Sequence, residues 1–239
     1  MLGLGNSITS GSSLEGFVDL NSVSSLQLWL KNGTGVTAAK WDDSSGNARH
    51  ATQGSTGDQA DASGGGLDFE EGESDHYDLA SEIVVAKSQG FCVAWVQDAE
   101  GSNSNNTILS DTANEVIQIQ NVNKIRITTN DDSNVESGLF TSGAYDSTKM
   151  LILVNRTGAG VWSVYKNGTE LTIEPDSGSS TNSDDGENIM GFTVDTLGAR
   201  RGTEHFFDGT LFEVAFWDRA LTDAEIANVN TYEVDIHSL

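Results

Sequence analysis

The chain has 239 residues, and its 36 Asp and Glu residues outnumber its 12 Lys and Arg residues, which gives a formal net charge of −24 at pH 7. Such a charge repels nucleic acids and anionic membrane surfaces, so we expect neither as a partner. The acidic excess has two interpretations: a surface kept soluble in a salty environment, or a surface that binds divalent cations. No Pro-rich linker or change of composition divides the chain, which favours one domain over two small ones.

The first 25 residues are mostly small and polar, with isolated apolar side chains that cannot form a core of their own. We expect residues 1–25 to form an extended arm that packs on its own domain or, as we favour, on a neighbouring chain of a homo-oligomer. The segment Met1–Ile8 has no positive charge and no continuous apolar run, so it does not resemble a signal peptide. The chain nowhere reaches the roughly 18 consecutive apolar residues of a membrane span, so we expect no membrane insertion.

Dense apolar segments follow the arm and predict an all-β protein. Residues 26–30 and 91–97 are apolar on both faces, which is typical of central strands. Residues 116–120 and 124–128 alternate between polar and apolar side chains and flank a short turn, which predicts a hairpin. Further strands are predicted at residues 150–154, 161–166, 169–173, 192–197 and 207–217, and polar loops at 98–106, 130–138 and 174–188.

Three local signals refine this prediction. Asn167 and Gly168 tolerate positive φ angles and predict a tight hairpin turn. Thr222 and Glu225 have the spacing of a capping box, which predicts a short helix directly after the last strand. Cys92 is the sole cysteine and lies in an apolar strand, so we expect a buried, inert thiol and no intrachain disulfide.

Several segments in chain order carry a family resemblance. They are Leu26–Leu30, the loop Trp41–Thr52 with its Ser-Gly-Asn and His-Ala pairs, the segments Leu67–Phe69 and Tyr77–Leu79, the segment Val161–Gly168, and the closing segment Phe206–Ile226. Together they resemble laminin-G-like domains of the concanavalin A-like lectin/glucanase superfamily, over residues 26–232. The resemblance implies a two-sheet antiparallel jelly-roll sandwich with a short C-terminal helix, formed by residues 26–239. It does not imply one activity, because different sites are grafted onto such folds.

The resemblance also directs the search for catalytic residues. Glycosidases on this fold use a Glu-x-Asp-x-(x)-Glu strand, whose carboxylates flank the sugar. The nearest match, Glu73–Asp78, ends in Asp and lies in an early loop, so we interpret it as a solvated acidic loop. The sequence has no Gly-x-Ser-x-Gly elbow, phosphate-binding loop or Cys-x-x-Cys pair, and we expect no enzymatic activity. The four histidines, His50, His76, His205 and His237, show no His-x-x-x-His spacing, and the resemblance implies a structural hydrogen bond for His50.

Calcium is the one cofactor that the acidic loops could hold, because it takes six to eight oxygen ligands. The candidate ligands are Asp42 and Asp43 with Asn47, Asp131 and Asp132, and Asp184 and Asp185 with Glu187, although none has the spacing of a known calcium loop. For a sugar ligand the candidates are aromatic side chains near loops or on alternating strands, namely Trp41, Tyr145 and Trp162. Trp41 belongs to the family-like loop and is expected to pack inward.

We therefore predict a non-catalytic structural or interaction protein with a lectin-like fold. The segment Met1–Ile8 resembles the opening of marine phage structural proteins, so the particular expectation is a virion component assembled in the host cytoplasm: a capsid decoration, fibre or appendage subunit. Its partners would be other chains of the assembly, contacted partly through residues 1–25, and host surface polysaccharide. The alternative is a carbohydrate-binding module, with or without calcium.

Overall fold

The computed structural model describes residues 19–100, 105–111, 115–121, 123–129, 139–141, 145, 147–175 and 191–239. Five of the candidate calcium ligands lie outside these ranges, namely Asp131, Asp132, Asp184, Asp185 and Glu187. The helical elements are the 3₁₀ turns η1 (Leu20–Ser22) and η2 (Glu71–Glu73) and the helix α1 (Asp223–His237). The strands are β1 (Leu26–Leu30), β2 (Val36–Thr37), β3 (Lys40–Trp41), β4 (Ala51–Thr52), β5 (Asp61–Ser63), β6 (Gly66–Phe69), β7 (Tyr77–Val85), β8 (Phe91–Ala99), β9 (Asn105–Ser110), β10 (Val116–Gln120), β11 (Lys124–Thr128), β12 (Leu139–Thr141), β13 (Met150–Arg156), β14 (Trp162–Lys166), β15 (Thr169–Glu170), β16 (Ile173–Pro175), β17 (Phe192–Leu197) and β18 (Gly209–Trp217).

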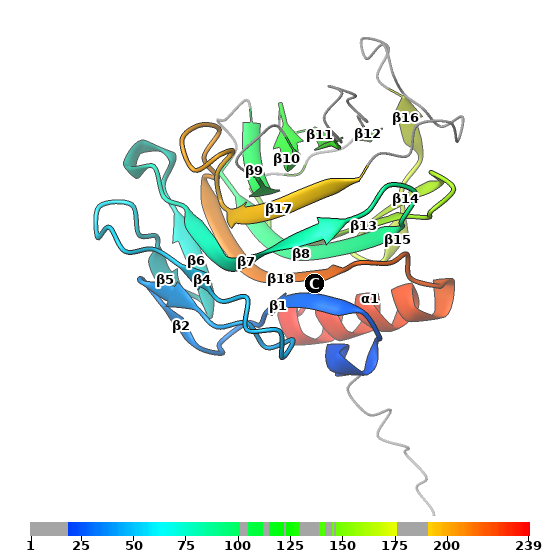
Figure 1. Ribbon diagram of the computed structural model, residues 1–239, viewed down its shortest axis with the longest axis horizontal. Coiled ribbons are helices and arrows are strands. Elements are labelled where there is room, and N and C mark those ends of the chain that lie inside the picture. Colours follow the sequence, from blue (N-terminus) through cyan, green and yellow to red (C-terminus); the bar gives the residue numbers. More distant parts are fainter. Residues whose placement is uncertain are drawn as a thin grey trace, which may run out of the picture.

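The strands form two large antiparallel sheets. In sheet A the order is β15-β14-β13-β8-β18-β6-β5, and β1 also pairs with β18. In sheet B the order is β11-β10-β9-β17-β7-β4-β3-β2, and β12 pairs with β16 separately. The helix α1 lies on the side of β18 that faces away from β17 (Figure 1). The predicted two-sheet jelly-roll sandwich with a C-terminal helix is therefore confirmed.

Two hydrophobic cores explain why the central strands are apolar on both faces. The first core lies between the sheets and contains Ile152 of sheet A and Val194 of sheet B. The second core lies between sheet A and α1, where Leu151 and Leu153 contact the layer that includes Val229. Successive side chains of a strand point to opposite faces, so β13 contributes to both cores in alternation. Cys92 lies in the second core, buried as its apolar surroundings predict.

The segment before β1 also belongs to this second core. Leu20 of η1 is fully buried, and Val23 is buried beside it. Residues 1–18 of the expected arm lie outside the described ranges. Residues 19–25 therefore contact their own domain.

The structure corrects some of the predicted boundaries. The predicted loop at 98–106 is shorter, because β8 extends to Ala99 and β9 begins at Asn105. The polar start of β9, Asn105-Asn106-Thr107, has no apolar alternation from which a strand could be predicted.

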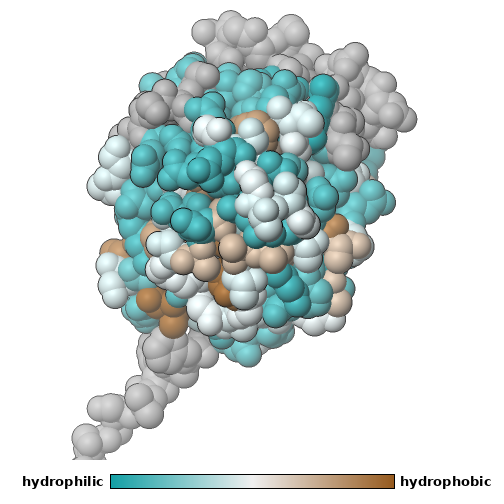
Figure 2. All heavy atoms as spheres, turned by 90° about the vertical axis from the view of Figure 1, so that its left-hand side faces the viewer, coloured by the Kyte–Doolittle hydropathy of each residue, from teal (hydrophilic) through white to brown (hydrophobic). Residues whose placement is uncertain are grey.

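Within the described residues, no helix has the length and hydropathy of a membrane span. The face in Figure 2 is largely hydrophilic, with small separate apolar patches.

Candidate functional site

The family-like loop after β3 is held by one carboxylate. Oδ1 of Asp43 accepts hydrogen bonds from the backbone N–H groups of Trp29 (2.9 Å) and Ser45 (2.9 Å), and Oδ2 accepts from Ser45 Oγ (2.9 Å) and the Arg49 N–H (2.9 Å). A carboxylate has about four lone-pair positions, and all are in use. Asp43 therefore anchors the loop and is not available to calcium, contrary to its candidacy as a ligand.

Its neighbours in the loop also have structural partners. Asp42 Oδ1 faces Lys40 Nζ and lies 3.0 Å from His50 Nδ1. Nδ1 of His50 accepts the Asp43 N–H at 3.1 Å, which is the structural hydrogen bond expected for this histidine. Asn47 donates to the carbonyl groups of Leu26 (2.9 Å) and Gln27 (3.1 Å) and so connects the loop to β1.

The aromatic candidates for sugar stacking do not form an exposed surface. Trp41 is fully buried and donates its indole N–H to the Lys31 carbonyl at 3.1 Å. Tyr145 is fully buried as well, and burial raises the pKa of its hydroxyl to about 12. Trp162 is half-buried, with its ring edge-on to Phe91 at 5.7 Å between centroids. Trp41 thus packs inward as expected, and Tyr145 has no ring face free for a sugar, which corrects its candidacy.

The early acidic loop does not supply a catalytic pair in strand geometry. Glu73 ends the 3₁₀ turn η2 and is exposed. Asp75 is buried, and its Oδ2 accepts the Glu70 N–H at 2.8 Å. Burial raises the pKa of Asp75, and nearby acidic residues add to this effect.

A groove of about 620 Å³ lies beside α1 instead. Its lining residues come from the β14–β15 hairpin and from one face of the helix: Tyr165, Gly168, Glu170, Asp223, Ile226, Ala227, Asn230, Thr231, Val234 and Asp235. The helical members recur three or four positions apart, which places them on one face of α1. None of the lining residues is basic, so the charged groups of the groove are all carboxylates.

The hairpin turn contributes Gly168 to the wall of the groove. Asn167 and Gly168 adopt φ angles of +46° and +76°, as the turn prediction requires. Asn167 exchanges two hydrogen bonds with the backbone of Leu151, at 2.8 and 3.0 Å. These bonds fix the turn on sheet A. Gly168 then lies against α1, where a Cβ atom on it would be 3.8 Å from Cβ of Asn230.

Asn230 is the most informative residue of the groove. Its side chain is 8% exposed, and its Oδ1 accepts no hydrogen bond within the described structure. A buried polar atom without a partner costs stability, so a ligand that donates a hydrogen bond would be favoured there. The groove is thus lined by Asn230, three acidic residues and Tyr165.

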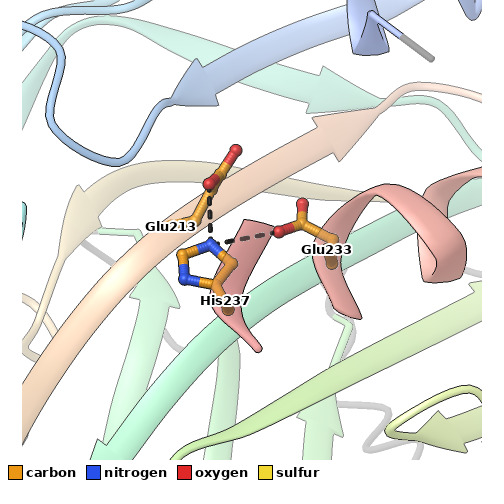
Figure 3. Close-up of side chains that lie close together, drawn as sticks. All are labelled: Glu213, Glu233 and His237. Atoms are coloured by element: carbon orange, nitrogen blue, oxygen red, sulfur yellow. Dashed lines mark hydrogen bonds and ion pairs between the residues drawn. The ribbon is translucent and has the colours of Figure 1, made fainter. Parts of the chain in front are cut away.

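A second polar feature lies where α1 packs against β18. Glu213 of β18 and Glu233 and His237 of α1 form a fully enclosed cluster (Figure 3). Nε2 of His237 lies 2.9 Å from Oε2 of Glu213 and 3.4 Å from Oε2 of Glu233. The Glu213 contact is a hydrogen bond, whereas Glu233 Oε2 accepts none within the described residues.

A β-bulge explains how Glu213 reaches this cluster. The pairing of β18 with β8 shifts register between Leu211 and Glu213. Leu211 and Val214 both belong to the first core, so the bulge directs the intervening residues to the α1 side. There the other oxygen of Glu213, Oε1, accepts the Trp29 indole N–H at 2.6 Å and the Tyr232 hydroxyl at 3.3 Å.

The cluster shifts the protonation of its members. Burial raises the pKa of Glu233, the charge of Glu213 adds to this, and the His237 imidazole offsets part of it. Burial by itself lowers the pKa of His237, but the hydrogen bond to Glu213 and the contact with Glu233 outweigh it, and the net direction is upward.

The sequence contained a signal for this cluster that the search for His-x-x-x-His spacing missed. Glu233-x-x-x-His237 places a carboxylate and an imidazole one turn apart on a helix face. Glu213 is the single charge in an otherwise apolar strand. The contact between Glu213 of β18 and the two residues of α1 depends on the tertiary fold.

The fold and these sites define a lectin-like sandwich. Residues 71–227, more than half of the chain, match the family model for the concanavalin A-like lectin/glucanases superfamily of the laminin-G type. The chain belongs to this family. No curated protein sequence matches the chain.

Solved structures share the fold at low sequence identity. The receptor-binding domain of botulinum neurotoxin D has a TM-score of 0.61 at 16% identity, covering 90% of this chain and 54% of that one. The binding domain of Paraclostridial Mosquitocidal Protein 1 has a TM-score of 0.60 at 15% identity, with coverages of 89% and 52%. Trypanosoma rangeli sialidase has a TM-score of 0.53 at 14% identity, with coverages of 89% and 33%. The chain thus spans about a third to a half of these proteins, and the likeness establishes the fold alone.

Proposed function

We propose that this protein is a non-catalytic binding module that recognises a carbohydrate in the groove between α1 and the β14–β15 hairpin. The observation that carries the proposal is a groove lined by side chains with hydrogen-bond acceptors, among them Asn230, whose Oδ1 has no partner within the described residues. Sugar hydroxyl groups donate hydrogen bonds to such acceptors, and the ring of Tyr165 offers an apolar surface for sugar C–H groups.

The lectin-like fold supports a recognition role. Two of the similar structures are the binding domains of protein toxins, and one of these is a receptor-binding domain. This analogy concerns the fold, whereas the groove residues are those of this chain. A sialidase is also among the similar structures, so the non-catalytic role is part of the proposal.

The test is a glycan array probed with the wild-type protein, with and without calcium, followed by titration of the best oligosaccharide. In Asn230→Leu the amide is lost at similar volume, and we expect at least about tenfold weaker binding because a hydrogen bond to the ligand disappears. Asn228→Leu, on the exposed side of the same helix, is the matched control and should bind as the wild type does. Equal affinity of the wild type and Asn230→Leu, or no glycan bound at all, would contradict the proposal.

We propose a second, wider role for the same protein as a subunit of an assembly, in particular a homo-oligomeric virion component. The strongly acidic composition supports a solvated outer surface, and residues 1–18 would contact a neighbouring chain. Light scattering of the purified protein should give a mass of several chains, and removing residues 1–18 should give the mass of one. A full-length monomer would contradict this role and leave glycan binding intact.

A further inference from the structure

Glu213, Glu233 and His237 each present one ligand atom to the same small space. The three ligand atoms lie within 4.8 Å of one another, and all three residues are buried. We propose that this cluster binds a single divalent transition-metal ion of the zinc class, held by Oε2 of Glu213, Oε2 of Glu233 and Nε2 of His237.

The distances between the ligand atoms fit such an ion. Zinc binds nitrogen and oxygen ligands at about 2.0–2.2 Å in a tetrahedron, so its ligand atoms are about 3.3–3.6 Å apart. Nε2 of His237 lies 2.9 Å from one carboxylate oxygen and 3.4 Å from the other. A shift of a few tenths of an ångström at Glu213 would bring its Oε2 to the tetrahedral distance from Nε2, and the two carboxylate oxygens already lie within 4.8 Å of each other.

The surrounding hydrogen bonds orient the ligands. Trp29 and Tyr232 both donate to Oε1 of Glu213, which leaves Oε2 directed at the imidazole. Among the residues that the structure describes, the other donor to Oε2 is the backbone N–H of Asn32, at 3.4 Å. Partners of this kind fix the orientation of metal ligands in known sites.

Glu233 is incompletely paired, because its Oε2 lies 3.4 Å from Nε2 of His237, beyond the roughly 2.7–3.2 Å of an ordinary N–H···O hydrogen bond. Its side chain is enclosed, yet its Oε2 accepts no hydrogen bond within the described residues. Buried carboxylate oxygens without a donor are rare, because they lose their hydration without compensation. A cation bound between Glu233 and Glu213 would satisfy this oxygen.

The donor set selects the class of ion. One imidazole and two carboxylates suit zinc, cobalt or nickel, whereas calcium requires six to eight oxygen ligands. The pair Glu233-x-x-x-His237 offers two ligands from successive turns of one helix. The fourth position would be taken by a water molecule, as in other sites with three protein ligands.

Binding must displace a proton. Nε2 of His237 donates to Glu213 in the metal-free protein, so the imidazole has to lose that proton to the solvent before its lone pair can bind the ion. Access is through the end of α1, since His237 is its last helical residue and terminal turns open more readily than helix centres.

The test uses the full chain, freed of metal with a chelator and titrated with Co²⁺ as a spectroscopic probe. We expect one Co²⁺ per chain, the intense visible absorption of tetrahedral cobalt, displacement by Zn²⁺, and release of protons during binding. The weak spectrum of octahedral cobalt, or no saturable binding, would overturn the proposal without reference to any variant.

The variants separate this site from general attraction to an acidic surface. Glu233→Gln should bind Co²⁺ at least about tenfold more weakly and lose the tetrahedral spectrum, and His237→Gln should do the same. Glu71→Gln makes the same charge change at an exposed position and should match the wild type. Equal weakening in Glu71→Gln and Glu233→Gln would overturn the proposal. Circular dichroism of each variant establishes that the fold is retained, and the wild-type spectrum decides the matter if a variant does not fold.

Discussion

At the scale of single residues, two adjacent aspartates in the loop after β3 have different roles. Asp43 accepts four hydrogen bonds and connects the loop to β1 through the Trp29 N–H. Asp42 makes an ion pair with Lys40, and its side chain is 37% exposed. Exposed ion pairs contribute little to stability, whereas losing the acceptor for several partly buried N–H groups is costly.

We therefore expect Asp43→Ala to lower the free energy of unfolding by about 2–4 kcal/mol, because its backbone donors lose their acceptor. Asp42→Ala is the matched control and should change it by less than about 1 kcal/mol. Urea denaturation of the two variants measures the difference. Equal losses would mean that Asp43 is not the anchor of the loop.

At the scale of elements, the junction of β18 and α1 is stabilised by a capping box and an ion pair. Thr222 and Glu225 make the reciprocal hydrogen bonds of the box, as their spacing predicts. Arg219 donates to both carboxylate oxygens of Glu225, at 2.7 and 2.9 Å, and also to the Ser24 carbonyl at 3.2 Å. One side chain therefore connects the helix start, the end of β18 and the segment before β1.

This junction gives the protein a pH-dependent contribution to stability. The hydrogen bond from Arg219 lowers the pKa of Glu225 to about 2, below the 4.5 of the unfolded chain. The contribution is thus present above pH 4.5 and lost as the pH falls towards 2. The Glu225 side chain is 27% exposed, so solvent screening reduces this contribution to stability. We expect Glu225→Gln to lower the free energy of unfolding by about 1–2 kcal/mol at pH 7.

Urea denaturation of the wild type and Glu225→Gln between pH 7 and pH 2 tests this expectation. The unfolding free energies of the two proteins should converge as the pH approaches 2, where Glu225 of the wild type becomes protonated. Asp223→Asn removes another acidic charge from the first turn without removing the Arg219 pair, and its difference from the wild type should be smaller. A constant difference for Glu225→Gln across the pH range would contradict the assignment.

At the scale of the whole molecule, the protein has three layers: sheet B, sheet A, and α1 with η1 (Figure 1). The second core, between sheet A and α1, contains the single thiol of the chain, and Cys92 is fully buried. Burial also raises the pKa of that thiol, so little thiolate forms. Reagents can reach Cys92 only when the helix layer separates from sheet A or the protein unfolds.

Cys92 should therefore report the opening of the helix layer. We expect a thiol reagent to label the native protein slowly and the unfolded protein at once. Val229→Ala removes buried contacts worth about 1–2 kcal/mol and should increase the labelling rate about tenfold. Asn228→Ala, at an exposed position of the same helix, should leave the rate unchanged. Immediate labelling of the native wild type would mean that α1 does not cover the thiol.

Much of the fold was predictable because its signals are local. The double-sided apolar run at residues 91–97 marks a strand buried on both faces, and Asn167-Gly168 marks a hairpin turn. The strand β9 was not predicted because its first three residues are polar. The inward packing of Trp41 was expected, whereas the sugar-binding candidate Tyr145 is buried as well, since a position near a loop does not decide which way a ring packs.

The buried cluster and the groove could not be predicted from the sequence and became visible only in the folded chain. Period-two alternation along β18 would place Glu213 on the same face as Leu211, and only the β-bulge directs it towards α1. The groove beside Asn230 likewise exists because the hairpin and the helix, far apart in the sequence, meet on sheet A. Local patterns in the sequence thus define the family, the strands and the helix cap, because each depends on residues a few positions apart. The cluster and the groove depend on contacts between distant segments, and those are set by how the sheets and α1 pack.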